Sequence, residues 1–557
     1  MPPEDEEMEE VARAEEQRAE AAVDDTTSSS ADSEAEPPGS GPRGVGPPLQ
    51  VGAHHRRRSL CDGGGLCSLG LWPPAQRPMI STSRLEEVRR ILDEGIRRLD
   101  TLVAGGYQGL FDRLAAAEVQ EMPFPTGLVE SIAESFMRLW DAEDAAARPQ
   151  SNDRQMAIRG RLLQCLLREA NDPDWKGMKH YFRGVRLGVN RRSPRTLAVF
   201  GRKKRWRVEG QSDADKYHGE ELMGMWRENY KSASAHASLV RSYLEQHARD
   251  GGQGFPICLE LSEAEARERL PNLTVMSLGV VSKKEEPTEI EDIRVVNDGT
   301  HGVQVNSHIR QRDQDRAPTA ADAKRLQRAQ SEENGIPLGL AIDVKGAHRI
   351  PPVHDLDWRH QGCRATEGTE VYIYMYGLFG ITVSAYWWAR LGGAILRCAH
   401  VVARPRQSLW VLLMADDFKV ESTAPDPKRE VVWFILLLSA LGVPLSWSKT
   451  QGGNEVAWIG FHLILSEYKL GITQKRADWA VAWLRREATN GKADLVGFRA
   501  ALGRLSFLAG ALEYDRPFLA PLFTFLSVMP HFGIRPLPLY VRVIMAHLAN
   551  RIERRRH

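Results

Sequence analysis

Three carboxylates occupy positions from which they could carry out metal-dependent chemistry. Asp343 lies near the end of the apolar run 340–344, and Asp416 and Asp417 follow a second apolar run, 409–414. A charge beside apolar strands is costly unless it is paired or binds a metal ion. Mg²⁺ suits one or two carboxylates together with substrate phosphates. The alternative interpretation is that an isolated Asp-Asp pair only shapes a turn.

Two strands are needed to bring these carboxylates together. Residues 340–344 and 409–414 have the length and composition of buried strands, 415–418 of a tight turn, and 419–421 of a returning strand. Adjacent strand residues face opposite sides, so the two neighbouring aspartates need not have equal roles. We expect Asp343 to lie beside Asp416, with the two sharing two divalent cations, and Asp417 to support them from the turn. Two cations about 3.5–4 Å apart can activate a 3′-hydroxyl and stabilise a leaving pyrophosphate.

The surrounding sequence resembles the reverse transcriptase family, and especially the enzymes of DIRS-like and related retroelements. Residues 343–348 are similar to the first catalytic motif of that family, 378–384 to the second, and 414–417 to its x-x-Asp-Asp box. The other matching segments are 280–284 with 293–298 (paired fingers strands), 441–449 (a lysine that closes on the nucleotide), 458–461 (a primer hairpin) and 502–509 with 515–519 (the thumb). Each segment is a weak signal alone, and the family order of the whole set carries the resemblance.

The resemblance implies roles for individual residues of this chain. The expected catalytic residues are Asp343, Asp416 and Asp417, of which Asp343 and Asp416 would hold two Mg²⁺ ions, with Mn²⁺ as the alternative metal. The residues expected to contact the incoming nucleotide are Lys283, Lys284, Arg294, His348, Phe379, Gly380 and Lys449. The expected primer grip consists of Trp458, Gly460 and Phe461. For the four cations, the alternative is an exposed side chain that binds no substrate.

His348 departs from the pattern of the family. The corresponding position usually carries Tyr or Phe, whose ring lies under the sugar and excludes a 2′-hydroxyl. Imidazole is smaller and can form hydrogen bonds, so the resemblance does not imply strong discrimination against ribonucleotides here. The alternative is that His348 forms a structural hydrogen bond and that another residue is the gate.

Basic residues are concentrated in the segment 176–207, which holds twelve Lys or Arg and no Asp or Glu. Its aromatic residues are Tyr181, Phe182, Phe200 and Trp206. Cations neutralise phosphates and aromatic rings can stack on unpaired bases, so the segment predicts contact with nucleic acid. The residues assigned to this contact are Arg202, Lys203, Lys204, Arg205 and Arg207. The alternatives are a solvated basic face or a nuclear-import signal.

The composition limits the class of protein. The 557 residues are 42% hydrophobic with a net charge of +1, but residues 1–40 carry −12, which leaves +13 on the rest of the chain. A basic body suggests a polyanionic partner. Six cysteines do not form a disulfide framework, and no apolar run reaches the roughly 18–20 residues of a membrane span. The acidic N-terminus is no signal peptide, so we expect an intracellular protein of the cytoplasm or nucleus that is not secreted.

Together these features predict an α+β fold of the right-hand polymerase type, with fingers, a ferredoxin-like palm and a thumb. The predicted boundaries are 1–80 for a disordered acidic tail, 81–254 for a helical region with the basic patch, 255–335 for the fingers, 336–465 for the palm, 466–530 for the thumb and 531–557 for a basic C-terminal extension. Neither an RNase H nor an integrase sequence is recognisable, which is typical of a partial retroelement.

The predicted function is that of an RNA-directed DNA polymerase of a retrotransposon, which extends a DNA or RNA primer on an RNA template with dNTPs. Two alternatives stay open. One is a catalytically silent, domesticated or decayed relative that binds RNA, and the other is an RNA-directed RNA polymerase. The three carboxylates favour the DNA polymerase, whereas His348 and the missing RNase H favour the silent binder. The thumb sequence argues against the RNA polymerase, and the oligomeric state is not predicted.

Overall fold

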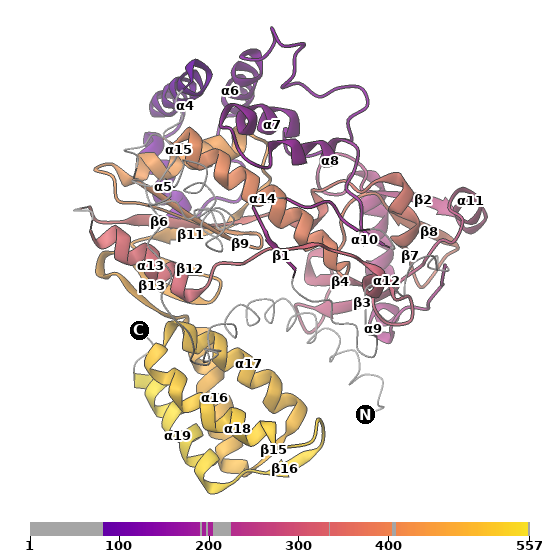
Figure 1. Ribbon diagram of the computed structural model, residues 1–557, viewed down its shortest axis with the longest axis vertical. Helices are drawn as coiled ribbons and strands as arrows, with labels where there is room; N and C mark the ends of the chain where they lie inside the picture. The colour runs from indigo at the N-terminus through magenta and orange to yellow at the C-terminus, as the bar shows by residue number, and fades with distance from the viewer. Residues whose placement is uncertain are drawn as a thin grey trace, which may run out of the picture.

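A computed structural model describes residues 82–189, 192–196, 199–203, 224–332, 335–403 and 408–554 (Figure 1). The predicted disordered tail, 1–80, lies outside the described residues. The described chain is a mixture of helices and strands, as the α+β prediction requires, while its division into fingers, palm and thumb stays a prediction. None of the described helices is both long and apolar enough to cross a lipid bilayer.

Four amphipathic helices open the described chain, as the hydrophobic periodicity over 82–170 predicts. They are α4 (Ser83–Leu102), α5 (Gly106–Ala115), α6 (Thr126–Arg138) and α7 (Gly160–Glu169). Thr82 caps α4 by accepting a hydrogen bond from the Leu85 backbone N–H at 3.2 Å, which satisfies a donor that has no partner within the helix. A 3₁₀ turn (Trp175–Met178) and the short α8 (Lys179–Phe182) follow.

A four-stranded antiparallel sheet with the order β11-β6-β10-β9 lies at the centre. Its strands are β6 (Leu338–Val344), β9 (Leu409–Met414), β10 (Asp417–Ser422) and β11 (Leu445–Gly453). Two long helices, α14 (Thr382–Val402) and α15 (Pro427–Ala440), run beside the sheet in Figure 1. Every residue of α15 from 431 to 440 is buried.

Two small sheets occupy the region around the predicted fingers. β3 (Ser277–Ser282) pairs with β4 (Ile293–Asp298) as predicted, and β2 (Cys258–Ser262), β8 (Glu370–Tyr374) and β7 (Gly362–Arg364) form a second sheet. The accompanying helices are α9 (Lys231–Ala235), α10 (Ala237–Arg249), α11 (Glu263–Arg269), α12 (Val305–His308) and α13 (Ala320–Ser331). Because β2 pairs with β8, this sheet crosses the boundary predicted at residue 335.

The C-terminal residues form a helical lobe at one end of the molecule, yellow in Figure 1. It follows the sheet of β12 (Glu455–Trp458), β13 (Phe461–Ile464) and β14 (Lys469–Ile472), and its helices are α16 (Gln474–Asn490), α17 (Leu495–Ala511), α18 (Ala520–Ser527) and α19 (Leu539–Arg554). Most of the predicted basic C-terminal extension, 531–557, is the helix α19, which packs against α16 and buries Val541, Met545 and Leu548.

Hydrophobic packing does not follow the predicted boundary at residue 254. One continuous cluster contains Leu92 of α4, Leu340 of β6 and Phe434 of α15. A second cluster joins α13 and β12–β14 to the C-terminal helices. Burial of apolar surface stabilises a fold by roughly 25 cal/mol per Å². The N-terminal helices and the central sheet therefore stabilise each other as one unit.

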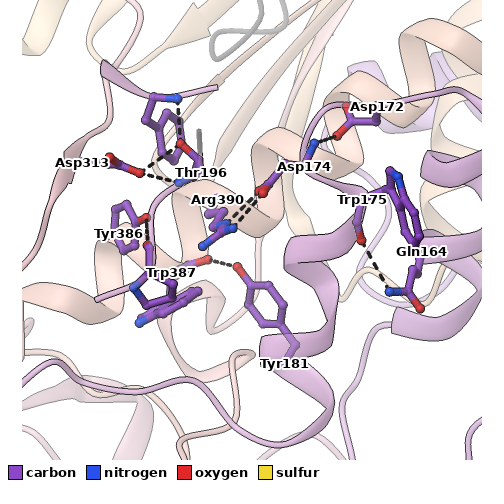
Figure 2. A network of polar contacts seen from close by, with 12 residues as sticks. Gln164, Asp172, Asp174, Trp175, Tyr181, Thr196, Asp313, Tyr386, Trp387 and Arg390 are labelled. Atoms are coloured by element: carbon purple, nitrogen blue, oxygen red, sulfur yellow. Dashed lines mark hydrogen bonds and ion pairs between the residues drawn. The ribbon is translucent and has the colours of Figure 1, made fainter. Parts of the chain in front are cut away.

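Two buried arginines attach α14 to the N-terminal region. Arg390 donates to both carboxylate oxygens of Asp174 at 2.7 Å, and Arg397 Nε donates to Asp172 Oδ2 at 2.7 Å. Figure 2 shows the Arg390–Asp174 pair near Tyr181, whose hydroxyl donates to a backbone carbonyl of α14 at 2.8 Å. Since a buried charge without a partner is strongly destabilising, these pairs fix the position of the helix.

Candidate active site

The register of the central sheet brings the three carboxylates to one end of β6 and β10. Asp417 is the first residue of β10 and lies directly opposite Asp343 of β6. Directly opposite residues of antiparallel strands have Cβ atoms about 4.5–5.5 Å apart on the same face. Asp416 lies in the adjoining turn, where its carbonyl accepts a hydrogen bond from Val344 N at 2.8 Å. Asp417 is therefore a strand residue and not the turn residue that was expected, while the charge of Asp343 acts on both Asp416 and Asp417.

Two tryptophans hold the turn that carries these aspartates. Ala415 has a φ of +51°, in the left-handed region, and its carbonyl accepts a hydrogen bond from Trp388 Nε1 of α14 at 2.7 Å. Trp458 Nε1 of β12 donates to the Asp417 carbonyl at 3.1 Å. Trp388 is not among the residues predicted for the site. A buried indole N–H usually has an acceptor, and this is the signal that could have indicated it.

The carboxylates of the turn are electrostatically unfavourable in this structure. Burial, together with the charges of Asp416 and Asp343, raises the pKa of Asp417 to about 7. Burial and Asp343 also raise the pKa of Asp416, while the cations Lys449 and Arg294 act in the opposite direction. Excess negative charge at this end of the sheet is therefore only partly compensated by the protein.

Lys449 of β11 supplies the nearest compensating charge, since its Nζ lies 2.9 Å from Asp343 Oδ2. The lysine side chain is 67% exposed, so it can leave this contact without uncovering the core. A cation is thus accommodated beside Asp343, and the oxygen donors are of the type that Mg²⁺ prefers. In the described part of the chain, no three His, Cys, Asp or Glu side chains converge closely enough to hold a metal ion by themselves. This donor set fits Mg²⁺ bound by one or two carboxylates and substrate phosphates.

His348, five residues after Asp343, contacts Phe379 of the second predicted motif. Their ring centroids are 4.8 Å apart, and the Arg349 guanidinium lies 5.6 Å from the Phe379 ring. Burial and the charge of Arg349 lower the pKa of His348 to about 4, so its imidazole is neutral at physiological pH. The first and second predicted motifs therefore meet through these two rings.

Gly380 joins the second motif to the hairpin β3–β4. Its φ is +95°, and a Cβ at this position would overlap the carbonyl oxygen of Asn297 in β4. Asn306 Nδ2 donates to the Gly380 carbonyl at 2.7 Å, and Asn306 Oδ1 accepts from Thr382 N at 3.0 Å. Glycine is required here because only it combines this backbone conformation with such a close approach.

The three cations predicted to bind triphosphate have different surroundings. Lys284 Nζ lies 2.5 Å from Asp292 Oδ1, and Lys283 Nζ donates to the Glu291 carbonyl at 2.6 Å. Arg294 is exposed on β4, and its charge acts on Asp416. Of these three cations, Arg294 is the one whose charge acts to lower the pKa of Asp416.

The predicted primer grip corresponds to a real hairpin with inaccessible side chains. β12 and β13 pair with Trp458 opposite Phe461, and Gly460 lies in the turn between them. Trp458 and Phe461 are each 1% exposed, and the Phe461 ring stacks on Phe507 of α17 at 4.7 Å. These two side chains pack the lobe against the sheet, so they cannot grip a primer directly.

The basic segment is only partly described. Arg202 is exposed on β1 (Gly201–Arg202), burial lowers the pKa of Lys203, and Lys204, Arg205 and Arg207 lie outside the described residues. The prediction that aromatic rings of this segment stack on bases is wrong for Tyr181, Phe182 and Phe200. These three are buried, because they pack in the core shared with α14.

Comparison with known proteins identifies structural neighbours alone. No protein-family model and no curated protein matches the chain. The foamy viral protease-reverse transcriptase dRH in complex with ds DNA is 12% identical with a TM-score of 0.40, over 60% of this chain and 50% of that chain. The foamy viral protease-reverse transcriptase with RNA/DNA hybrid is 14% identical with a TM-score of 0.40, over 60% of this chain and 39% of that chain. The chain thus spans about half the length or less of these two neighbours, which are reverse transcriptases and are matched weakly.

Proposed function

We propose that this protein is an RNA-directed DNA polymerase that transfers a nucleotide from a dNTP to a primer 3′-hydroxyl. The observation that supports it best is the strand register, which pairs Asp343 with Asp417 and sets Asp416 in the adjoining turn. Burial, and after it repulsion among these carboxylates, raises the pKa of Asp416 and of Asp417. A site with this excess of negative charge is suited to binding the divalent cations that accompany a nucleoside triphosphate.

In this proposal, Asp343 and Asp416 hold the metal ions, Mg²⁺ or alternatively Mn²⁺, and Asp417 shapes the site from β10. Bound metal supplies charge stabilisation for the reacting phosphate and lowers the pKa of the attacking hydroxyl. Lys449, whose side chain is exposed, would be able to leave Asp343 and contact the nucleotide phosphates. Arg294 binds the triphosphate from the fingers side, and Phe379 with His348 forms the wall against the sugar. The partners are an RNA template and a DNA or RNA primer.

Primer extension on poly(rA)/oligo(dT) with Mg²⁺ and dTTP tests this function directly. We expect incorporation by the wild type and loss of at least about 10³-fold in Asp416→Asn/Asp417→Asn, because transition-state charge stabilisation is the largest catalytic contribution. Asp144→Asn, an exposed aspartate outside the site, is the matched control and should retain activity. A folded wild type that binds RNA without incorporation would contradict the proposal and indicate the silent binder.

A second candidate, an RNA-directed RNA polymerase, is favoured by one observation. The residue against Phe379 is an imidazole rather than a larger phenyl or phenol ring, so a ribose 2′-hydroxyl meets less steric obstruction. The same assay with UTP on poly(rA) separates the two polymerases. Preference for UTP would identify the RNA polymerase, and His348→Tyr should then shift the preference toward dTTP.

A further inference from the structure

A cavity of about 1130 Å³ lies on the N-terminal side of the molecule, apart from the three carboxylates. Its walls come from α7, α8, the segments 150–153, 183–188 and 192–194, Arg312 and His354. Gln164 of α7, labelled in Figure 2, belongs to this wall. The cavity therefore joins the helical region to the loop that precedes α13.

The charge of this cavity is strongly positive. Six Lys or Arg side chains line it, namely Arg161, Lys179, Arg183, Arg186, Arg192 and Arg312, against one carboxylate, Asp153. Two of the cations are neutralised, since Arg161 pairs with Asp153 at 2.6 Å and Arg186 with Asp357 at 2.8 Å.

The other four cations, Lys179, Arg183, Arg192 and Arg312, are exposed, and within the described chain their side chains form no ion pair or hydrogen bond. They converge on one hollow with no carboxylate left to oppose them. Such a group favours an anion that carries several charges.

Buried carboxylates fix the segments that present these cations. Asp357 accepts hydrogen bonds from Arg186 and from the Leu187 backbone N–H at 2.7 Å. Asp313, which is 0% exposed, accepts from Arg195 Nε at 2.7 Å and from Thr196 Oγ1 at 3.1 Å, the second of which is drawn in Figure 2. Asp357 and Asp313 therefore form their hydrogen bonds within the protein, behind the surface that lines the cavity. These hydrogen bonds fix the backbone segments that carry the cations, so less conformational entropy is lost when a ligand binds.

We infer that this cavity binds the phosphate backbone of single-stranded RNA. A space of this volume accommodates a few unpaired nucleotides. Arginine and lysine match phosphate in charge and geometry, and the amides of Gln150, Asn152 and Gln164 can hydrogen-bond to sugar or base. The choice of RNA rather than DNA rests on the proposed function, whereas the choice of a phosphate polymer rests on the cavity itself.

Fluorescence anisotropy with fluorescein-labelled oligo(rA), in EDTA and without nucleotides, tests the inference in the full chain. Lys179→Glu/Arg183→Glu and Arg192→Glu/Arg312→Glu should each weaken binding at least tenfold at 0.1 M salt. The slope of log Kd against log salt should fall by about 0.7 for each phosphate that the variant no longer neutralises. Arg113→Glu/Arg249→Glu changes the same charge at exposed positions outside the cavity and should bind like the wild type.

Equal binding by the cavity variants and the control variant would overturn the inference. If a charge-reversed variant fails to fold, as judged by circular dichroism, Lys179→Gln/Arg183→Gln provides the same test with a smaller perturbation. Competition by poly-glutamate as strong as that by unlabelled oligo(rA) would identify an acidic protein partner and also overturn it. RNA binding that depends on the cavity, without primer extension, would contradict the proposed polymerase function and support this inference. Failure of the proposed function can therefore be distinguished from failure of this inference.

Discussion

At the scale of single residues, the ionised carboxylates of Asp416 and Asp417 lower the stability of the folded protein. In a polymerase, bound metal ions would compensate for this loss. The pKa of Asp417 is raised to about 7 in the folded protein, against an ordinary value near 4. Its ionised form is therefore destabilising at neutral pH, where the unfolded chain would ionise freely.

Asp417→Asn should accordingly be more stable than the wild type in EDTA at pH 7.5, by about 1–3 kcal/mol in the free energy of unfolding. Mg²⁺ should raise the thermal midpoint of the wild type and have a smaller effect on the variant, because the variant has one negative charge fewer. Urea and thermal unfolding measure both effects, with Asp144→Asn as the control. A variant less stable than the wild type in EDTA would refute this account of the site.

His247 of α10 gives the molecule a pH dependence of the opposite kind. Its Nδ1 lies 2.7 Å from the Tyr374 hydroxyl and its Nε2 lies 3.1 Å from an Arg349 nitrogen. Burial and the Arg349 charge lower the pKa of His247 to about 2. The unfolded chain therefore binds a proton below about pH 6.5 that the folded chain does not, so stability is lost as the pH falls.

Between pH 7 and pH 5 this one residue should reduce the free energy of unfolding by about 2 kcal/mol. His247→Gln should unfold with a weaker pH dependence than the wild type, because glutamine keeps a polar group there without a titrating one. Urea midpoints at the two pH values measure the difference, and the exposed His531→Gln serves as the control. A pH dependence unchanged by His247→Gln would contradict the assignment.

At the scale of elements, α14 depends on its buried ion pairs. Asp174→Asn would leave Arg390 with an uncompensated buried charge, which costs about 3–5 kcal/mol. Replacing both partners, as Arg390→Met/Asp174→Leu, should recover most of that loss. Urea unfolding compares the variants, with Asp141→Asn, which removes one partner of an exposed pair, expected to cost less than about 1 kcal/mol. Equal losses for Asp174→Asn and Asp141→Asn would show that the buried pair does not fix the helix.

Helices and strands that show a local sequence pattern could be predicted, whereas the elements that pack against them could not. A continuous apolar run located β9 and the strand that returns from it located β10, whereas the pair β3–β4 was expected only from the family resemblance. The register that sets Asp417 opposite Asp343 depends on how the turn between β9 and β10 closes, so it could not be read from residue types. The burial of Trp458 and Phe461 depends on α17, which packs from a distant part of the sequence.

The helix α19 was missed for a compositional reason. Its arginines suggest an exposed basic tail, but Val541, Met545, Leu548 and Ile552 recur at helical spacing and are all buried. The helical spacing of these apolar residues predicts an amphipathic helix, whatever the number of arginines in the segment.

At the scale of the whole molecule, the N-terminal helices and the central sheet should fold as one unit. A chain that begins at residue 255 would expose the apolar partners of α4, α6 and α7, so we expect it to be insoluble or molten. A chain that begins at residue 82 keeps all described contacts and should show the circular dichroism and thermal midpoint of the full chain. Cooperative unfolding of the shorter chain would contradict the single shared core.

The contact between α4, the first described helix, and the centre of the molecule also determines how long synthesis takes to bring its two partners together. Arg429 of α15 pairs with Asp93 of α4, although 336 positions separate them in the sequence. At the usual rate of about 5–20 residues per second, a ribosome needs about 17–67 s to connect the two. For that interval the apolar stripe of α4 is outside the ribosome without its final neighbour, so the newborn chain depends on a chaperone or on temporary contacts among α4–α7.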